Sequence, residues 1–204
     1  GLIADNGFTD DTSPLLGGEI NAPLASCETL VVYRDGVVIG NATIDGTNWS
    51  YTDSGLSDGL HSYSVRVVDL AGNQGAASAA YRLNVDTSAI ASPSLSLASD
   101  TGNSNADGIT NNGAIHVSGL ESGATWQYST NGGSTWTNGT GNDIILSGDG
   151  AKSVITRQTD ASGNRSANST ALAFILDTST PTITSSTTAA SINENTAAFQ
   201  VIYT

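Results

Sequence analysis

The acidic residues of this 204-residue sequence have the clearest potential chemistry. Acidic side chains number 19 against 6 basic ones, so the formal net charge is -13, and most of the acids are Asp. Several Asp residues lie in segments rich in Gly, Asn and Thr, as at Asp10-Asp11 and Asp107-Gly108. Short carboxylates on turns are typical ligands of Ca²⁺, which takes six to eight oxygen atoms. We therefore expect Ca²⁺ as the cofactor.

Two short segments recur at one spacing. Asp69–Asn73 (DLAGN) recurs as Asp160–Asn164 (DASGN), and the triplet DTS occurs at 86–88 and 177–179, each time 91 residues apart. This period has the size of a domain and is too long for a solenoid turn. It predicts one domain over 1–87 and a second over 88–178. The pattern leaves open whether the N-terminal strand of the first domain is complete.

Short apolar runs separated by turn residues predict strands throughout both units. Leu30–Arg34 and Val37–Gly40 flank an Asp35-Gly36 pair, which is a favoured hairpin turn. Residues 61–68 alternate polar and apolar side chains, as expected of a strand with one buried face. About seven strands in roughly 90 residues is typical of an immunoglobulin-like sandwich. The predicted fold is all-β, with tandem immunoglobulin-like β-sandwiches in an elongated arrangement.

Strand parity predicts which acidic loops meet. In a seven-strand sandwich the A–B loop lies beside the linker that leaves the domain, and the F–G loop faces the preceding domain. We therefore expect one Ca²⁺ site at the first junction, a partial site at the second junction, and a pair of ligands facing a preceding domain. Their residues are, in that order, Asp5, Asp10, Asp11, Asp86, Asp160 and Asn164; Asp100, Asp107 and Asp177; and Asp69 and Asn73.

Asp and Asn in turns also cap backbone N–H groups without binding any ion. That interpretation is favoured for the remaining acids of hairpin turns, which are Asp35, Asp45, Asp53, Asp58, Asp143 and Asp149.

Charge and composition exclude several classes of partner. The negative charge would repel nucleic-acid phosphates and anionic membrane surfaces. No run of 18 apolar residues occurs that could cross a bilayer, and no secretion signal is visible. The single Cys27 allows no internal disulfide. We expect no nucleic-acid partner and no membrane insertion.

Catalytic groups are scarce. His61 and His116 lie in different repeats at strand positions expected to face solvent, and no motif ties a Ser or Cys to a His and an acid. An enzyme is therefore not expected. Trp49, Trp126 and Trp136 could stack on sugars, but a core position between two sheets is favoured for all three.

The segment SDTGNSNADGIT at 99–110, with RQTDASGN at 157–164 and DTSTPT at 177–182, resembles the bacterial Ig-like repeats of giant Gram-negative surface adhesins of the biofilm-associated and RTX types. The first unit, with TDDTSPLLGG and VVDLAGN, resembles a sister repeat. The resemblance implies an extracellular location on the bacterial cell surface, type I secretion and a role in cell adhesion or biofilm formation. It also implies an extender region that Ca²⁺ between domains stiffens. INEN at 192–195 resembles the start of a cadherin-like repeat, so 179–204 is expected to begin a third domain.

Three functions stay open at this point. The first is a structural stalk whose partners are neighbouring repeats of the same polypeptide, with the chain a monomer. The second is a glycan- or protein-binding adhesion module. In the third, the β-prone tail Phe199–Tyr203 exchanges as a donor strand between chains.

Overall fold

The computed structural model describes residues 2–182, whose regular structure consists entirely of β-strands. No helix in this range could cross a membrane. The first unit contains β1 (Gly7–Thr9), β2 (Leu15–Glu19), β3 (Glu28–Arg34), β4 (Val37–Asn41), β5 (Thr43–Asp45), β6 (Asn48–Thr52), β7 (Gly59–Asp69) and β8 (Tyr81–Val85). The second contains β9 (Ser94–Leu97), β10 (Ile109–Thr110), β11 (Ala114–Ser118), β12 (Thr125–Ser129), β13 (Thr137–Asn138), β14 (Asp143–Ile145), β15 (Gly150–Thr159) and β16 (Leu172–Leu176).

Each unit is a sandwich of a five-stranded and a three-stranded sheet. The large sheets have the orders β1-β8-β7-β3-β4 and β10-β16-β15-β12-β13, and the small sheets have the orders β2-β6-β5 and β14-β11-β9. In both units the first strand of the large sheet pairs parallel with the last strand of the unit, β1 with β8 and β10 with β16. The predicted all-β tandem sandwich is confirmed, with eight strands in each unit where about seven were expected.

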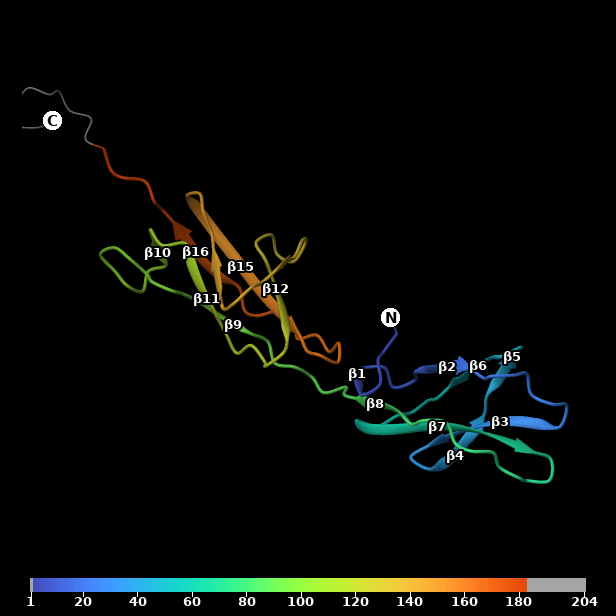
Figure 1. The fold of residues 1–204 in the computed structure, drawn as a ribbon. Coiled ribbons are helices and arrows are strands. Elements are labelled where there is room, and N and C mark those ends of the chain that lie inside the picture. Colours follow the sequence, from blue (N-terminus) through green and yellow to red (C-terminus); the bar gives the residue numbers. More distant parts are fainter. Residues whose placement is uncertain (1, 183–204) are drawn as a thin grey trace, which may run out of the picture.

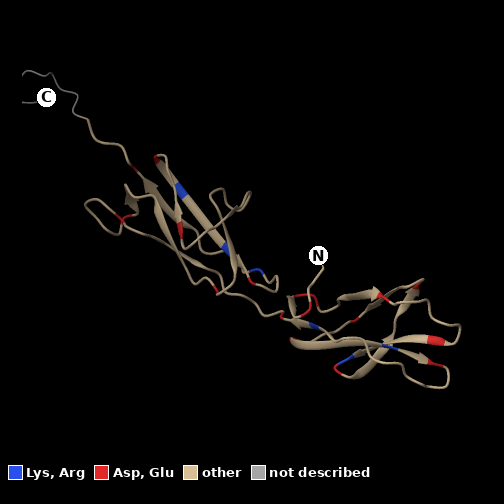
Figure 2. Ribbon diagram, viewed as in Figure 1, with Lys and Arg blue, Asp and Glu red and all other residues tan. Residues whose placement is uncertain are grey.

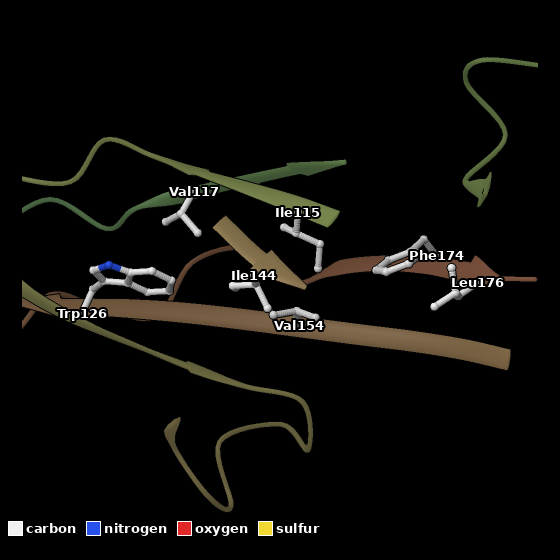
Figure 3. Close-up of a cluster of buried hydrophobic side chains, with 7 residues drawn as sticks. All are labelled: Ile115, Val117, Trp126, Ile144, Val154, Phe174 and Leu176. Atoms are coloured by element: carbon white, nitrogen blue, oxygen red, sulfur yellow. The ribbon is translucent and has the colours of Figure 1, made fainter. Parts of the chain in front are cut away.

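The inner faces of the sheets supply a separate core in each unit. Seven buried side chains from five strands form the core of the second unit, and Figure 3 shows them between the two layers: Ile115, Val117, Trp126, Ile144, Val154, Phe174 and Leu176. The core of the first unit contains Leu16, Val32, Leu56, Tyr63, Leu83 and Val85. Alternation along β11 and β16 places every second side chain in the core, which is the pattern of a strand with one buried face.

The three tryptophans have different environments. Trp126 is buried in the second core, as expected, and its indole N–H donates to the Gly141 carbonyl at 3.0 Å. Trp49 is partly buried and packs against the first core. For Trp136 the expectation of a core position was wrong. It is half-buried at the surface, where the Arg157 guanidinium stacks 3.8 Å from its ring centroid.

A buried ion pair stabilises the first unit where a capped turn was expected. Asp53 is only 5% exposed, and its carboxylate accepts two hydrogen bonds from the Arg34 guanidinium at 3.0 and 2.8 Å. The Tyr63 hydroxyl donates to the same carboxylate at 2.8 Å. Burial is the main cause that raises the pKa of Tyr63, and this hydrogen bond is the second. Asp53 does cap the Ser54 N–H at 2.8 Å, as expected of a turn residue, but its charge is also paired inside the sandwich, which the sequence did not indicate.

The two units lie end to end, joined by the segment between β8 and β9 (Figure 1). The strands of the first unit end at Val85 and those of the second begin at Ser94. Of the predicted third domain, residues 183–204 lie outside the described range, and so do the INEN motif and the tail Phe199–Tyr203.

Replacing Trp126 with Ala should lower the free energy of unfolding of the second unit by about 3–5 kcal/mol, because a large cavity forms in the core. The matched control is Ile145→Ala, since Ile145 is 76% exposed on β14 and should cost no more than about 0.5 kcal/mol. Urea unfolding followed by circular dichroism measures both. Equal losses in the two variants would contradict the assigned core.

Candidate functional site: the junction between the units

The first unit fixes the linker residues that leave it. The Asp86 N–H donates to the Thr9 carbonyl at 2.9 Å, which extends the β1–β8 pairing by one step. The N–H and hydroxyl of Thr87 both donate to Asp58 Oδ1, at 3.0 and 2.8 Å. The Ser88 N–H donates to Asp86 Oδ1 at 2.9 Å. The backbone of the linker is thus held in one conformation before it reaches the second unit.

The second unit contacts the same linker through the loop between β15 and β16. Asn164 Nδ2 donates to the Asp86 carbonyl at 2.8 Å, and the Ser162 hydroxyl donates to Asp86 Oδ2 at 3.4 Å. A Cβ atom on Gly163 would lie 3.3 Å from the Asp10 carboxylate, and the φ of Gly163 is +107°, a conformation that favours glycine. The loop therefore lies directly against the linker and against Asp10, the residue that follows β1.

An Asp at the start of this loop holds its backbone in place. Asp160 Oδ1 accepts the N–H groups of Ser162, Gly163 and Asn164 at 2.8–2.9 Å, and Oδ2 accepts Asn164 Nδ2 at 2.9 Å. Burial raises the pKa of Asp160, but these hydrogen bonds outweigh burial and leave the pKa below its ordinary value. The side-chain amide of Asn164 therefore donates both to its own loop, at Asp160, and to the linker, at Asp86.

The corresponding loop of the first unit has the same internal bonds. Asn73 donates through its N–H and its Nδ2 to Asp69, both at 2.8 Å, and these bonds lower the pKa of Asp69. The predicted placement of this loop at the pole opposite the linker agrees with the structure, where β7 runs away from the junction before the loop (Figure 1).

The structure brings four of the six residues predicted for the first junction together: Asp10, Asp86, Asp160 and Asn164. The other two acids are engaged elsewhere. Asp5 Oδ1 accepts the Arg82 N–H at 2.6 Å, which holds Asp5 on β8. Asp11 Oδ1 accepts the Ser13 N–H at 2.8 Å and caps the turn after β1. Figure 2 shows acidic segments, in red, where the two units meet.

The second junction repeats the linker contacts of the first. The Asp177 N–H donates to the Thr110 carbonyl at 2.9 Å, and the Thr178 N–H donates to Asp149 Oδ1 at 2.9 Å. The Ser179 N–H donates to Asp177 Oδ1 at 3.0 Å. Asp177 therefore has the same contacts to the unit before it as Asp86 has to the first unit.

Asp100 and Asp107 belong to one loop between β9 and β10. Asp107 Oδ1 accepts the Ile109 N–H and Asp100 Oδ2 accepts the Gly108 N–H, both at 3.0 Å. Asp100 Oδ1 is buried and has no hydrogen-bond partner. A buried carboxylate oxygen without a partner is costly, so this atom is the one in the loop that a cation would satisfy.

Two functional residues were missed by the sequence reasoning. Asp58 and Asp149 were assigned to capped hairpin turns, and they do cap backbone N–H groups, but those N–H groups belong to the linkers. Their signal was available, because they also lie 91 residues apart before a glycine.

The similar acidic segments Asp10-Asp11 and Asp107-Gly108 do not occupy equivalent positions in the two units. Asp11 N–H bonds Thr9 Oγ1, and the same contact joins the Asn112 N–H to Thr110 Oγ1. The equivalent of Asp11 is therefore Asn112, and Asp107 lies before β10 instead of after it. An insertion between β9 and β10 shifts the register of the repeat there.

The metal assignments stay predictions. Within residues 2–182, no group of three or more His, Cys, Asp or Glu side chains lies arranged to hold a metal ion. Ca²⁺ also accepts backbone carbonyl, hydroxyl and amide oxygens, so a pair of carboxylates with such neighbours is compatible with it.

Each histidine bonds an aspartate of its own unit. His116 is exposed and bonds Asp143 at 3.0 Å. His61 was expected to face solvent, but its side chain is only 13% exposed, because Asp35 and the Ser57 carbonyl hold its two ring nitrogens.

Comparison with known proteins supports the fold. The profile of the bacterial Ig-like domain family matches residues 1–87, so the first unit is similar to that family. Among solved structures, the fibronectin(III)-like modules of Clostridium thermocellum CbhA match over 85% of this chain and 90% of theirs, with 13% identity and a TM-score of 0.51. At that identity the likeness concerns the fold. A search of curated proteins finds no match to the sequence.

Asn164→Ala should loosen the junction, because it removes the side-chain bond to the Asp86 carbonyl, a contribution of about 1 kcal/mol. Asn73→Ala is the matched control, since it removes the equivalent bond to Asp69 within a loop that contacts no linker in the described chain. The measurement is ¹⁵N relaxation. We expect the rotational correlation times of the two units to diverge only in Asn164→Ala, and equal behaviour of the two variants would refute this role.

Acid should weaken both linker attachments. Hydrogen bonds from Thr87 lower the pKa of Asp58, and those from Thr178 lower the pKa of Asp149. A depressed pKa in the folded state contributes stability that is complete above the ordinary Asp value of about 4 and is lost as pH falls through the folded pKa. The melting temperature should therefore drop below about pH 4.

The double variant Asp58→Asn with Asp149→Asn should show a smaller drop over the same range, because an amide does not titrate. Calorimetry between neutral and acidic pH makes the comparison. An identical pH profile for the parent and the double variant would show that these carboxylates do not contribute.

Proposed function

We propose that this chain is a structural extender module, a pair of Ig-like sandwiches that holds other parts of a surface protein at a distance. The observation that carries the proposal is the linker contact set. Asp86 is bonded by Thr9 of the first unit and by Asn164 of the second. The first-unit half of the set recurs at Asp149, Thr178 and Asp177. A module that presents the same attachment at both successive ends is suited to an array of repeats.

A rod of this kind functions by resisting bending. Reorientation of the second unit would break the hydrogen bonds that its loop donates to Asp86, and the one from Asn164 has a net contribution of about 1 kcal/mol. Within residues 2–182, the two histidines bond to Asp35 and Asp143 in separate units, which supports a non-catalytic role.

Calcium is the second part of the proposal. The supporting observation is Asp100 Oδ1, a buried carboxylate oxygen that no donor satisfies, in a loop that also contains Asp107. Bound Ca²⁺ would supply a positive charge that both carboxylates can share. Extracellular calcium modules bind with dissociation constants of about 10⁻⁴–10⁻³ M, in keeping with the proposed location at a bacterial cell surface.

The resemblance to adhesin repeats supports a role in cell adhesion or biofilm formation, in which the adhesive contact is made by other domains. Direct binding of a glycan or protein by these units is the alternative. Trp136 is the side chain that favours it, because it lies at the surface and outside the core. One face of its ring is already covered by Arg157, which leaves less of the indole for a sugar. The extender role is therefore preferred.

Calcium should raise the melting temperature of the chain, and Asp100→Asn should remove most of that rise. The amide still accepts the Gly108 N–H but has lost the charge that binds a cation. Asp45→Asn is the matched control, since Asp45 lies exposed in β5. Calorimetry with CaCl₂ or EGTA measures the shift.

Two outcomes would count against calcium at this loop. One is a melting temperature that does not respond to CaCl₂. The other is an equal response in the parent chain and in Asp100→Asn. Either leaves the extender role intact, because the linker contacts do not depend on the ion.

A further inference from the structure

A connected row of polar side chains crosses the outer face of the large sheet of the second unit. Arg157 of β15 lies opposite Gln127 of β12, and Gln127 lies opposite Asn138 of β13. Their chain neighbours Trp126 and Gln158 are buried, so the row points away from the core. Gln127 Oε1 accepts hydrogen bonds from Arg157 Nε at 3.2 Å and Nη2 at 2.9 Å, and Gln127 Nε2 donates to Asn138 Oδ1 at 2.9 Å. These bonds fix the position of the Arg157 guanidinium.

A second arginine extends the row from the loop after β15. Arg165 is exposed and pairs antiparallel with Thr159, so it lies on the same face as Arg157 and diagonally across from it. Figure 2 shows the corresponding blue segments on β15 and on the loop that follows it. The pKa of Arg157 lies below its ordinary value, first because of desolvation and then because of the charge of Arg165. Two positive charges therefore lie side by side, at a cost that a bound anion would offset.

Neither of these two arginines is neutralised by a carboxylate of residues 2–182. The sequence has 19 acidic residues and 6 basic ones, yet Arg34 is the one Lys or Arg side chain in that range that forms an ion pair. Gln127 occupies the Nε–Nη2 edge of Arg157, and no acceptor in the described chain bonds Nη1. The end of the guanidinium formed by Nη1 and Nη2 is therefore available to a carboxylate in the bidentate arrangement.

Trp136 restrains the same guanidinium from its other side. The ring centroid lies 3.8 Å from Arg157 Cζ. A planar guanidinium stacked on an indole keeps its charge and its donors while it loses rotamer freedom, so less entropy is lost when an anion binds. The group offered to a ligand here is thus the arginine, and the indole holds it in place.

A polar hollow of about 890 Å³ adjoins the row at Asn138. Its lining includes the side chains of Ser118, Thr125 and Asn142, and it also includes Glu121. Hydroxyl and amide groups both donate and accept hydrogen bonds, as sugar hydroxyls do. The surroundings of the two arginines therefore suit a ligand that combines a carboxylate with several hydroxyls.

The first unit contains only part of this arrangement. Arg66 stands 91 residues before Arg157 and also lies over an aromatic ring, at 5.6 Å. Its strand neighbour is Val31, where the second unit has an amide, and Gln74 occupies the place of the second arginine. The paired charges and the amide row are thus specific to the second unit, and Arg66 provides a matched control.

We propose that the row formed by Asn138, Gln127, Arg157 and Arg165 is a binding site for an acidic saccharide, one that carries the carboxylate of a uronic acid. The free end of the Arg157 guanidinium donates two hydrogen bonds to the carboxylate, and Arg165 supplies a second positive charge. The sugar hydroxyls bond the Asn138 amide and the polar lining of the hollow. This activity is separate from the extender role, which depends on the linker contacts.

The test is calorimetric titration of the full chain with trigalacturonate, in EGTA so that calcium does not bridge the saccharide and the acidic protein. We expect saturable binding that weakens as NaCl is added. Arg157→Gln should weaken it at least about tenfold, because the charge-assisted hydrogen bonds are lost. Arg165→Gln should weaken it about threefold, because one nearby charge is lost. Arg66→Gln should bind as the parent does.

Two further ligands separate the saccharide from other acidic partners. The methyl ester of trigalacturonate has the same sugars without the charge, and triglutamate has the charges without the hydroxyls, so both should bind more weakly than trigalacturonate. Arg165 is exposed and Arg165→Gln should keep the melting temperature of the parent, so its effect on binding can be measured even if Arg157→Gln disturbs the fold. The proposal would be overturned by the absence of binding, by equal binding of the ester or of triglutamate, or by an unchanged affinity of Arg165→Gln.

Discussion

The extender role proposed for this chain depends on how the polar groups of a three-residue linker are satisfied. Asp86, Thr87 and Ser88 lie between two hydrophobic cores that share no side chain. Such a linker would be a hinge if its backbone bonded water. Instead the N–H of Asp86 is bonded within the first unit and its carbonyl by the second. A single residue therefore connects the sheet of one unit with a loop of the next.

The aspartates show how one side chain can stiffen a turn and leave few free lone pairs for an ion. Asp160 accepts four hydrogen bonds, three of them from backbone N–H groups, and so the lone pairs of its carboxylate are largely occupied by protein donors. Asp58 does the same for the linker with fewer bonds. Asp100 differs, because one of its oxygens is buried without a donor. The carboxylates that order the backbone and the carboxylate suited to a cation are thus different residues, although all belong to acidic turns.

Much of this arrangement could be predicted from the sequence, because the features involved are periodic. The 91-residue repeat identified the Asp69–Asn73 and Asp160–Asn164 loops, and strand parity placed the second of them at the linker. The placement holds although each unit has eight strands, because β1 and β8 run parallel, as do β10 and β16. Parity could not place Asp5 and Asp11, whose carboxylates bond Arg82 and Ser13 locally.

The errors share a physical cause, which is that the sequence pattern does not show which charges are paired. Asp53 follows a strand like any turn residue, and its partner Arg34 is 19 positions away on another strand. Trp136 is of a residue type common in cores, but it lies in the loop between β12 and β13, where the Arg157 guanidinium covers one face of its ring.

The central claim is that the linker holds the two units in one relative orientation. Residual dipolar couplings measured on the full chain test it most directly, because couplings from each unit define an alignment tensor independently. The account predicts that one tensor, with the same magnitude and axes, fits residues 7–85 and 94–176 together. Two tensors of clearly different magnitude would show that the units reorient independently and would contradict the account.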